Sequence, residues 1–443
     1  MTTKQSFKER VRARMRKTGE RYTTARAHLL GTLGQDGGAV ELRGHPFRRG
    51  LCRDTTAVSN ALAALDTRLS PGGAPIDEVL LTGLSGGVGF LYIVFEYPDT
   101  PPLASVLTRF DTSADKFALG GLARLGFGAP SETTSDAKAR RELDAALDAG
   151  RTVLCVADSS IVSGTASPGA VAGMAPTIVA VVARDGDEYV VDAGTGRVER
   201  LSREALAGAR ASFKPAKRRC LALSPPDEPV DALPAVHDAL AACAHRYEHA
   251  PYKGYASNFG LAGMDKFVKA LTNPRDKRGW PKLFPDGKLA ALGLRRLYQG
   301  LEIEMTPPSA GRGVQADFLR ASADATGHAP YRAAADAFDA AGRAWSEVSA
   351  FVASCDVPAV RTGCEMLDAY AELLDEQASL GDEARSAAAR RAMDSPADGD
   401  ASELTAEKAR AIYAEVATRA TQAVAAEREA HAALAGACAE VTR

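Results

Sequence analysis

The sequence has few aromatic residues, no close cysteine pair and no long apolar run. Its seven cysteines are an odd number, and the closest two stand nine residues apart, at 355 and 364. This spacing argues against a disulfide framework and against a zinc site. No window offers the ~20 consecutive apolar residues that a membrane span needs. We therefore expect no membrane contact, no bound metal and no cofactor.

Neither sign of charge dominates the chain, and its first residues do not form a signal peptide. Lys and Arg number 54 against 56 Asp and Glu, a net charge of -2. This balance argues against a nucleic-acid-binding surface over the whole protein. Residues 1–26 lack the apolar core of a signal peptide, so a cytoplasmic location is expected. An Arg-rich, acid-poor start also occurs in organellar transit peptides, and that alternative stays open.

The composition is that of a folded protein with more than one domain. Hydrophobic residues make up 46% and charged residues 25% of the 443 positions, and this length predicts two or three domains. Nine basic and two acidic residues in the first 26 predict a basic helical arm. The arm either packs as a solvated helix on acidic surface or contacts an acidic partner or nucleic acid. The predicted units are the arm (1–40), a mixed domain (41–224), a helical domain (225–352) and an Ala-rich helical tail (353–443).

The mixed domain is predicted to be α+β with a small antiparallel sheet. Asp185-Gly186 lies between two apolar runs and is a strong hairpin signal. Short apolar runs and helical spacing predict strands at 91–95, 152–157, 177–183 and 188–192, and helices at 56–65, 140–147 and 202–210.

The second half of the chain is predicted to be helical throughout. From Val236 onward no segment has a convincing strand pattern. Prolines at 274, 281, 285, 307 and 308 interrupt long Ala-rich helical patterns. The last predicted helix runs from about Thr405 to Val441 and is longer than most globular helices. It is either a packed bundle helix or an oligomer contact.

Cys52 is the strongest candidate for a nucleophile. It stands just before a predicted helix whose start is marked by Asp54, Thr55 and Thr56, which are good capping residues. Unpaired N–H groups and the positive end of the helix dipole stabilise a thiolate, and the thiolate is the reactive form. The alternative is an ordinary buried thiol. Nearby positive charge comes from Arg48, Arg49 and Arg53.

Two sequence blocks in the mixed domain form a recognisable pattern. The first is Leu51-Cys52-Arg-Asp-Thr-Thr-Ala57, and the second is the glycine-rich Gly83-Leu-Ser-Gly-Gly-Val-Gly-Phe-Leu-Tyr92. Together they resemble the N-terminal domain of the butirosin biosynthesis protein H family. Residues 258–263, 279–284 and 317–319, followed by Trp345, are similar to the helical domain that accompanies it. The resemblance covers roughly residues 45–350.

The resemblance implies a papain-like thiol fold and a role in secondary metabolism. The family's named member transfers an acyl group from a carrier-protein thioester to an amine during the biosynthesis of aminoglycoside antibiotics. Such a site needs a histidine base and an acidic residue that orients it. In the family pattern the acidic position is matched by Asp192. The histidine position falls at Pro176 or Thr177, and neither side chain accepts a proton near pH 7.

The sequence departs from the family pattern at two further places, and the identity of the base stays open. Leu51 stands where a histidine usually precedes the cysteine, and the segment from Met305 to Gly311 replaces a glycine-rich turn. His45, seven residues before the cysteine, is one replacement base. His245 or His249 could reach across from the helical domain. Alternatively, no base exists and the site binds without turnover.

Four residues are candidates for substrate binding. Gly86 and Gly87 belong to a loop whose backbone N–H groups can cradle a carbonyl or a phosphate. Arg49 supplies positive charge near the cysteine, and Asp158 ends the strand that contains Cys155. For each residue the structural alternative is a turn, a solvated charge or a core position.

The implied partners are an acyl carrier protein and a small amine. A basic cluster beside an aromatic residue can bind phosphopantetheine or an acidic carrier surface. Solvated charges at a helix end are the equally plausible account of that cluster, which comprises Arg275, Lys277, Arg278 and Lys282 around Trp280.

Two functions remain open from the sequence. The first is a cysteine-dependent acyltransferase of low or altered activity, with Cys52, Asp192 and His45 as its catalytic residues. The second is a non-catalytic pseudoenzyme that binds partners on the same fold. A thiol pKa well below 7 favours the first, and an ordinary thiol pKa of about 8.5 favours the second.

Overall fold

The computed structural model describes most of the chain beyond the predicted arm. The described residues are 41–42, 44–69, 73–98, 100–111, 113–159, 162, 176–225, 231–305, 308–376 and 401–441. The predicted basic arm over 1–40 therefore lies outside the described residues. The described fold is α+β, as predicted, with a small antiparallel sheet followed by a helical region.

The first part of the chain contains all the strands that the structure describes. Its elements are β1 (Glu41–Leu42), β2 (His45–Pro46), α3 (Arg53–Ala64), α4 (Glu78–Leu84), β3 (Leu91–Phe95), β4 (Leu103–Leu107), α5 (Ala114–Arg124), α6 (Asp136–Asp148), β5 (Val153–Asp158), β6 (Pro176–Asp185), β7 (Glu188–Asp192), β8 (Glu199–Ser202), α7 (Arg203–Ser212), the 3-10 helix η1 (Lys214–Ala216) and β9 (Cys220–Ala222).

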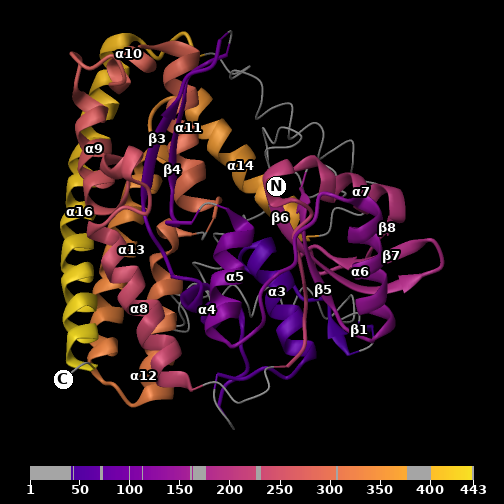
Figure 1. Cartoon of the computed structure of the whole chain (residues 1–443). Coiled ribbons are helices and arrows are strands. Elements are labelled where there is room, and N and C mark those ends of the chain that lie inside the picture. The colour runs from indigo at the N-terminus through magenta and orange to yellow at the C-terminus, as the bar shows by residue number, and fades with distance from the viewer. Residues whose placement is uncertain are drawn as a thin grey trace, which may run out of the picture.

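The rest of the described chain is helical, as predicted. Its elements are α8 (Ala232–Glu248), η2 (Lys253–Asn258), α9 (Gly260–Thr272), α10 (Trp280–Leu283), α11 (Gly287–Glu302), η3 (Ser309–Gly311), α12 (Arg312–Thr326), α13 (Pro330–Ser354), α14 (Pro358–Glu376) and α16 (Ala406–Val441). Figure 1 shows these helices as a bundle beside the sheet, with α16 along its outer side.

The main sheet has five antiparallel strands in the order β8-β7-β6-β5-β9. The predicted hairpin is confirmed: β6 and β7 are joined at Gly186, whose φ of 59° is the left-handed conformation that such tight turns require. In this hairpin Ala180 pairs with Asp192, which places Asp192 at the end of β7. The Asp192 carboxylate therefore lies at the C-terminal end of β7, in the residue pair furthest from the hairpin turn.

The two faces of the sheet are covered by different helices because strand side chains alternate in direction. Leu154, Ile178 and Ala180 face the large core that includes α3 and α5. Cys155 and Val179, one position along, face a second core with α6 and α7. Cys155 is thus a core residue, and the layer that contains α3 lies against the helical bundle.

The large core is continuous between the sheet side and the bundle. A two-stranded antiparallel ribbon of β3 and β4 extends from the sheet side among the bundle helices (Figure 1). Tyr92 on this ribbon accepts a hydrogen bond of 3.1 Å from the buried Trp280 indole. One apolar cluster contains both Val58 on α3 and Leu434 on α16. The final helix is therefore a packed bundle helix in this chain.

The bundle also encloses a buried ion pair. Arg312 at the start of α12 and Glu427 on α16 are both fully buried and in direct contact. The Trp345 indole donates a further hydrogen bond of 3.1 Å to the same carboxylate. None of the helices in the described ranges combines the length and apolar character required to cross a membrane.

Gly83 on α4 is predicted to be essential for packing. A Cβ at this position would lie 2.0 Å from the Phe318 ring on α12, and overpacking of this kind costs about 1–3 kcal/mol. Gly83→Ala should therefore lower the free energy of unfolding by about that amount in a denaturant titration.

Gly313→Ala is the matched control, because a Cβ there would meet no atom within 4 Å. It replaces a helical glycine without a clash, so it should be neutral or stabilising by up to about 1 kcal/mol. Equal stability of the two variants would contradict the close α4–α12 contact.

Candidate active site

The candidate site is centred on Cys52, which lies at the N-terminus of α3. It is the N-cap, with extended backbone (φ -141°, ψ 129°), and its carbonyl accepts the first helical hydrogen bond from the Thr56 N–H at 2.8 Å. The Thr55 and Thr56 hydroxyls also donate to this carbonyl, at 3.0 and 2.8 Å. The predicted helix is therefore present but begins at Arg53, so Asp54, Thr55 and Thr56 lie inside its first turns and the N-cap is Cys52, which makes no side-chain capping bond.

The Cys52 sulfur lies between a carboxylate and a guanidinium. Sγ donates to Oδ1 of Asp54 at 2.9 Å and accepts from Nη2 of Arg109 at 2.8 Å. Arg109 and Asp54 form a buried ion pair, with Nη1 2.8 Å from Oδ2. Arg109 also stacks over the Phe117 ring at 4.3 Å. The half-buried Cys52 thiol and the buried Asp54 and Arg109 side chains thus form a Cys–Asp–Arg triad.

The environment of this triad favours the neutral thiol. Burial raises the pKa of Cys52 far above its usual range, and the neighbouring Asp54 carboxylate raises it further. The Arg109 guanidinium acts in the opposite direction but does not outweigh them. For Asp54, burial opposes ionisation, yet Arg109 holds the pKa of that carboxyl below its usual range. The expected thiolate stabilisation by the helix terminus is thus outweighed by burial and by an acidic neighbour.

A second carboxylate occupies the backbone donors at the start of α3. Glu78 accepts from the Leu51 and Cys52 N–H groups at 2.5 and 2.6 Å. Its Oε1 also lies 2.7 and 3.1 Å from the Thr55 and Thr56 hydroxyls, each of which shares its one hydrogen between this carboxylate and the Cys52 carbonyl. These are the groups that a helix N-terminus offers to an anion. The N–H of the candidate nucleophile is therefore already bonded within the protein.

The helical part of the chain contributes one backbone carbonyl that contacts the triad. Nη2 of Arg109 donates to the Met305 carbonyl at 2.8 Å. Met305 begins the segment that replaces a glycine-rich turn of the family pattern. Its φ is 62°, and Ser309 and Ala310 also have positive φ, of 57° and 55°. The segment thus places three non-glycine residues in the left-handed region that glycine favours.

His45 and Asp192 form a second polar cluster, which does not touch the triad. Nε2 of His45 lies 2.9 Å from Oδ2 of Asp192, and both side chains are buried. The Asn60 amide on α3 donates to the same oxygen at 2.8 Å. The sulfur of Cys52 bonds to Asp54 and Arg109, whereas the buried Nδ1 of His45 has no hydrogen-bond partner among the residues that the structure describes. The structure therefore brings together two predicted catalytic residues, His45 and Asp192, but not the histidine and the thiol.

The end of β7 nevertheless lies near the start of α3. Gly194 donates its N–H to Oδ1 of Asp192 at 2.8 Å. A Cβ on Gly194 would lie 2.1 Å from the carbonyl oxygen of Arg53, the residue after Cys52. Asn60 is eight positions beyond Cys52, about 12 Å along a helix axis. The two clusters are thus neighbours along α3, separated by about two helical turns.

The predicted substrate-binding residues are dispersed rather than gathered at the sulfur. The N–H groups of Gly86 and Gly87 donate to the carbonyls of Gly83 and Thr82 and so end α4. A Cβ on Gly86 would face Arg246, 3.1 Å away, in the helical part. Two backbone N–H groups used in this way offer no cradle to a substrate carbonyl.

Arg49 and Asp158 also have partners away from the thiol. Nε of Arg49 donates to the Thr195 carbonyl at 3.2 Å, which joins the segment before Cys52 to the loop after β7. Asp158 is fully buried and accepts from the Ser212 hydroxyl at 2.7 Å. Both contacts are consistent with roles in the scaffold.

The remaining candidates lie in the helical part. His245 and His249 are exposed and stack on each other, with ring centroids 4.1 Å apart. His249 is also hydrogen-bonded to the His245 carbonyl at 3.2 Å. Trp280 is buried in the core, so the basic residues around it do not frame an exposed ring. Across the residues that the structure describes, no group of three or more acidic, His or Cys side chains is arranged to hold a metal ion.

Sequence reasoning missed three residues of the site. Asp54 was interpreted only as a capping residue, although it stands two positions from the thiol. Glu78 and Arg109 received no role. Arg109 follows the strand β4 and is flanked by Thr108 and Phe110, so a charge inside an otherwise buried stretch was the available signal.

Comparison with protein families gives two matches, one after the other along the chain. Residues 54–192 match the family described as butirosin biosynthesis protein H, N-terminal. Residues 204–384 match a domain of unknown function (DUF4872). Residues 54–192 are thus similar to the N-terminal domain of butirosin biosynthesis protein H, and the predicted resemblance is confirmed. The matched range begins two residues after Cys52. No curated protein matches the chain.

Asp54→Asn should make Cys52 more reactive. Removing the carboxylate removes one cause of the raised thiol pKa and leaves Arg109 to stabilise a thiolate. Each unit by which the pKa falls multiplies the thiolate fraction at pH 8 by about ten. We expect alkylation of Cys52 by iodoacetamide, followed by mass spectrometry, to be at least about tenfold faster in the variant.

The wild-type rate should keep rising with pH to 9 and beyond, because the folded thiol is neutral below its raised pKa. Cys52→Ala identifies the signal from this site. Asp66→Asn, an exposed change just after α3, is the matched control and should leave the rate unchanged. A wild-type rate that levels off below pH 7 would contradict the neutral thiol.

Proposed function

We propose that this chain transfers acyl groups through a thioester formed on Cys52, on a papain-like scaffold. The observation that carries the proposal is the position of the Cys52 sulfur within hydrogen-bonding distance of both Asp54 and Arg109. The butirosin biosynthesis protein H match supports an acyltransferase-like role. The donor is then an acyl thioester, by resemblance one carried by an acyl carrier protein, and the acceptor is a small amine.

Asp54 is the proton acceptor that the geometry favours. Its carboxylate already accepts the thiol hydrogen, whereas His45 has no contact with the sulfur. As Asp54 takes this proton, the sulfur bonds to the thioester carbonyl carbon. The departing thiolate then recovers the proton from Asp54. In the second half, an amine displaces the Cys52 sulfur and its proton returns through Asp54 to that sulfur.

The pKa of the Cys52 thiol is raised and that of the Asp54 carboxyl is lowered, so proton transfer between them is unfavourable and the reaction is slow. The thiol holds its proton tightly and the carboxylate is a weak base because of Arg109. General base catalysis typically contributes 10²–10⁴-fold, and most of that factor is lost when base and acid are poorly matched. We therefore expect turnover well below that of a thiol paired with histidine.

Arg109 is assigned a second role at the tetrahedral stage. Acyl transfer enzymes stabilise the oxyanion with donors next to the nucleophile. The Cys52 N–H is bonded to Glu78 at 2.6 Å. The Arg109 guanidinium, 2.8 Å from the sulfur, is the cation closest to the developing charge.

His45 and Asp192 are assigned as positioning residues. Their cluster holds the Asn60 amide and, through Gly194, the loop that packs on Arg53. It thereby fixes the orientation of α3 against the sheet. This assignment accounts for a buried polar pair that does not contact the thiol.

A thioester on Cys52 should be detectable by intact-protein mass spectrometry. A simple acyl thioester of a pantetheine analogue should add one acyl mass to the wild type and none to Cys52→Ala. Asp54→Asn should be alkylated faster yet form the amide product more slowly, by about tenfold or more, because the proton acceptor is lost. Asp66→Asn should match the wild type in both assays. Amide formation that persists in Cys52→Ala would overturn the proposal.

A non-catalytic binding role is the second candidate, and one observation favours it. The Cys52 N–H is already bonded to Glu78, and burial holds the thiol neutral. A protein of this kind would bind an acyl carrier protein or an amine without a covalent intermediate. Binding of the thioester with no acyl mass on Cys52, even at pH 9, would decide for this role.

A further inference from the structure

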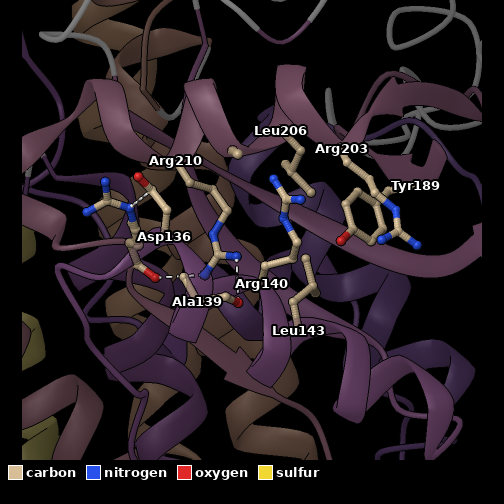
Figure 2. A pocket seen from close by; sticks show the side chains of 10 residues that line it. Asp136, Ala139, Arg140, Leu143, Tyr189, Arg203, Leu206 and Arg210 are labelled. Carbon is tan, nitrogen blue, oxygen red and sulfur yellow. Dashed lines mark hydrogen bonds and ion pairs between the residues drawn. The ribbon is translucent and has the colours of Figure 1, made fainter. Parts of the chain in front are cut away.

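We propose that the seam between α6 and α7 binds the phosphate group of a phosphate monoester. This site lies on the face of the sheet opposite α3 and is separate from the proposed acyl-transfer site. Figure 2 shows a pocket there with side chains from both helices and from β7. It is lined by Asp136, Ala139, Arg140, Leu143, Tyr189, Arg203, Leu206, Ala207, Arg210 and Arg218. Four guanidinium groups thus face one carboxylate.

Arg210 is the central residue of the pocket. It is 4% exposed, and its Nη1 and Nη2 donate to the carbonyls of Ala139 and Arg218 at 3.3 and 2.9 Å. No carboxylate pairs with it among the described residues, and its buried Nε has no hydrogen-bond partner. A buried cation without a counter-ion is costly. The described residues thus leave this cation without a carboxylate, and a bound anion would supply the missing charge.

The other arginines differ in how far they are neutralised. Arg218 is paired with Asp136 at 2.5 Å, and Arg203 lies 3.8 Å from Asp144 and 3.9 Å from Asp187. Asp144 is shared, since it also accepts the Tyr189 hydroxyl at 2.8 Å. Arg140 forms no ion pair within the described part of the chain. In Figure 2 its side chain rises from α6 between Arg210 and the Tyr189 ring.

Charge and size identify the class of ligand. Within the described ranges Arg140 and Arg210 have no carboxylate partner, which leaves two positive charges, and a phosphate monoester carries about -1.5 to -2 at pH 7. Guanidinium forks match phosphate oxygens in geometry. The pocket is open to solvent and its cavity volume is about 20 Å³, which is enough for one oxygen-sized group. One phosphate oxygen would therefore enter beside Arg210, and the remainder would lie at the rim beside Arg140 and Arg203.

The structural alternative is that Arg210 only stabilises the fold, by its hydrogen bonds to the Ala139 carbonyl on α6 and to the Arg218 carbonyl before β9. That role needs no ligand and predicts no dependence on phosphate. The two accounts are separated by Arg140, which is exposed on α6 and makes no contact that the fold requires. Arg141, its neighbour on the same helix, is also exposed but does not line the pocket. Arg140→Ala therefore removes one positive charge inside the proposed site. Arg141→Ala removes one positive charge outside it.

The test is phosphate binding to the full-length chain at pH 7.5, measured by calorimetry with inorganic phosphate and pyrophosphate at constant ionic strength. Wild type and Arg141→Ala should each bind phosphate and pyrophosphate saturably. The affinity of the variant for each anion should equal that of the wild type. Arg140→Ala should bind about tenfold more weakly, the loss expected for one charge-assisted hydrogen bond. Dimethyl phosphate, a singly charged diester, should also bind more weakly than phosphate, and this distinguishes a monoester from the diester of a pantetheine arm.

The proposal fails if phosphate binds no better than chloride, or if the two variants lose affinity equally. Tighter binding of dimethyl phosphate than of phosphate would also overturn it, because it would assign the site to a diester. Cys52→Ala should leave all of these affinities unchanged. A failure of acyl transfer at Cys52 therefore does not affect this test.

Discussion

The buried ion pair between Asp54 and Arg109 is the interaction on which the site depends. It joins the start of α3 to the end of β4, and it sets the protonation of the thiol between them. A carboxylate beside a thiol opposes ionisation, while a guanidinium favours it, so the pair gives Cys52 two partners of opposite effect. The burial of the group tips this balance toward the neutral thiol. In the proposed reaction the thiol therefore loses its proton to Asp54 only as the sulfur bonds to the acyl carbon, and not beforehand.

The site is built on the seam between the two matched families. The triad takes Cys52 and Asp54 from the start of α3, Arg109 from the β3–β4 ribbon, and a carbonyl from Met305 in the helical part. The ribbon lies inside the bundle, and one apolar core runs through both parts. Segments far apart in the sequence thus meet at the sulfur, which is the arrangement expected of a site held by a rigid scaffold.

Local patterns predicted the elements of this fold well, and they predicted the contacts of the site poorly. The hairpin at Gly186, the alternation along β5 and β6 and the final helix all follow from neighbouring residues. The pairing of Cys52 with Arg109 spans 57 positions, and that of His45 with Asp192 spans 147. No local pattern encodes such pairs, because they depend on how strands and helices are ordered in space. The resemblance identified Asp192 as an acidic partner, but only the fold shows that His45 reaches it.

The carbonyl of Met305 has a consequence for how the protein is made. Arg109 gains this acceptor only after the chain has been synthesised some two hundred residues beyond it. Until then the nascent domain contains a thiol and a guanidinium that lack their final surroundings. Arg109 can therefore complete its hydrogen bonds beside the thiol only when the helical part is present. The two families found together in this chain are, in this sense, a single chemical unit.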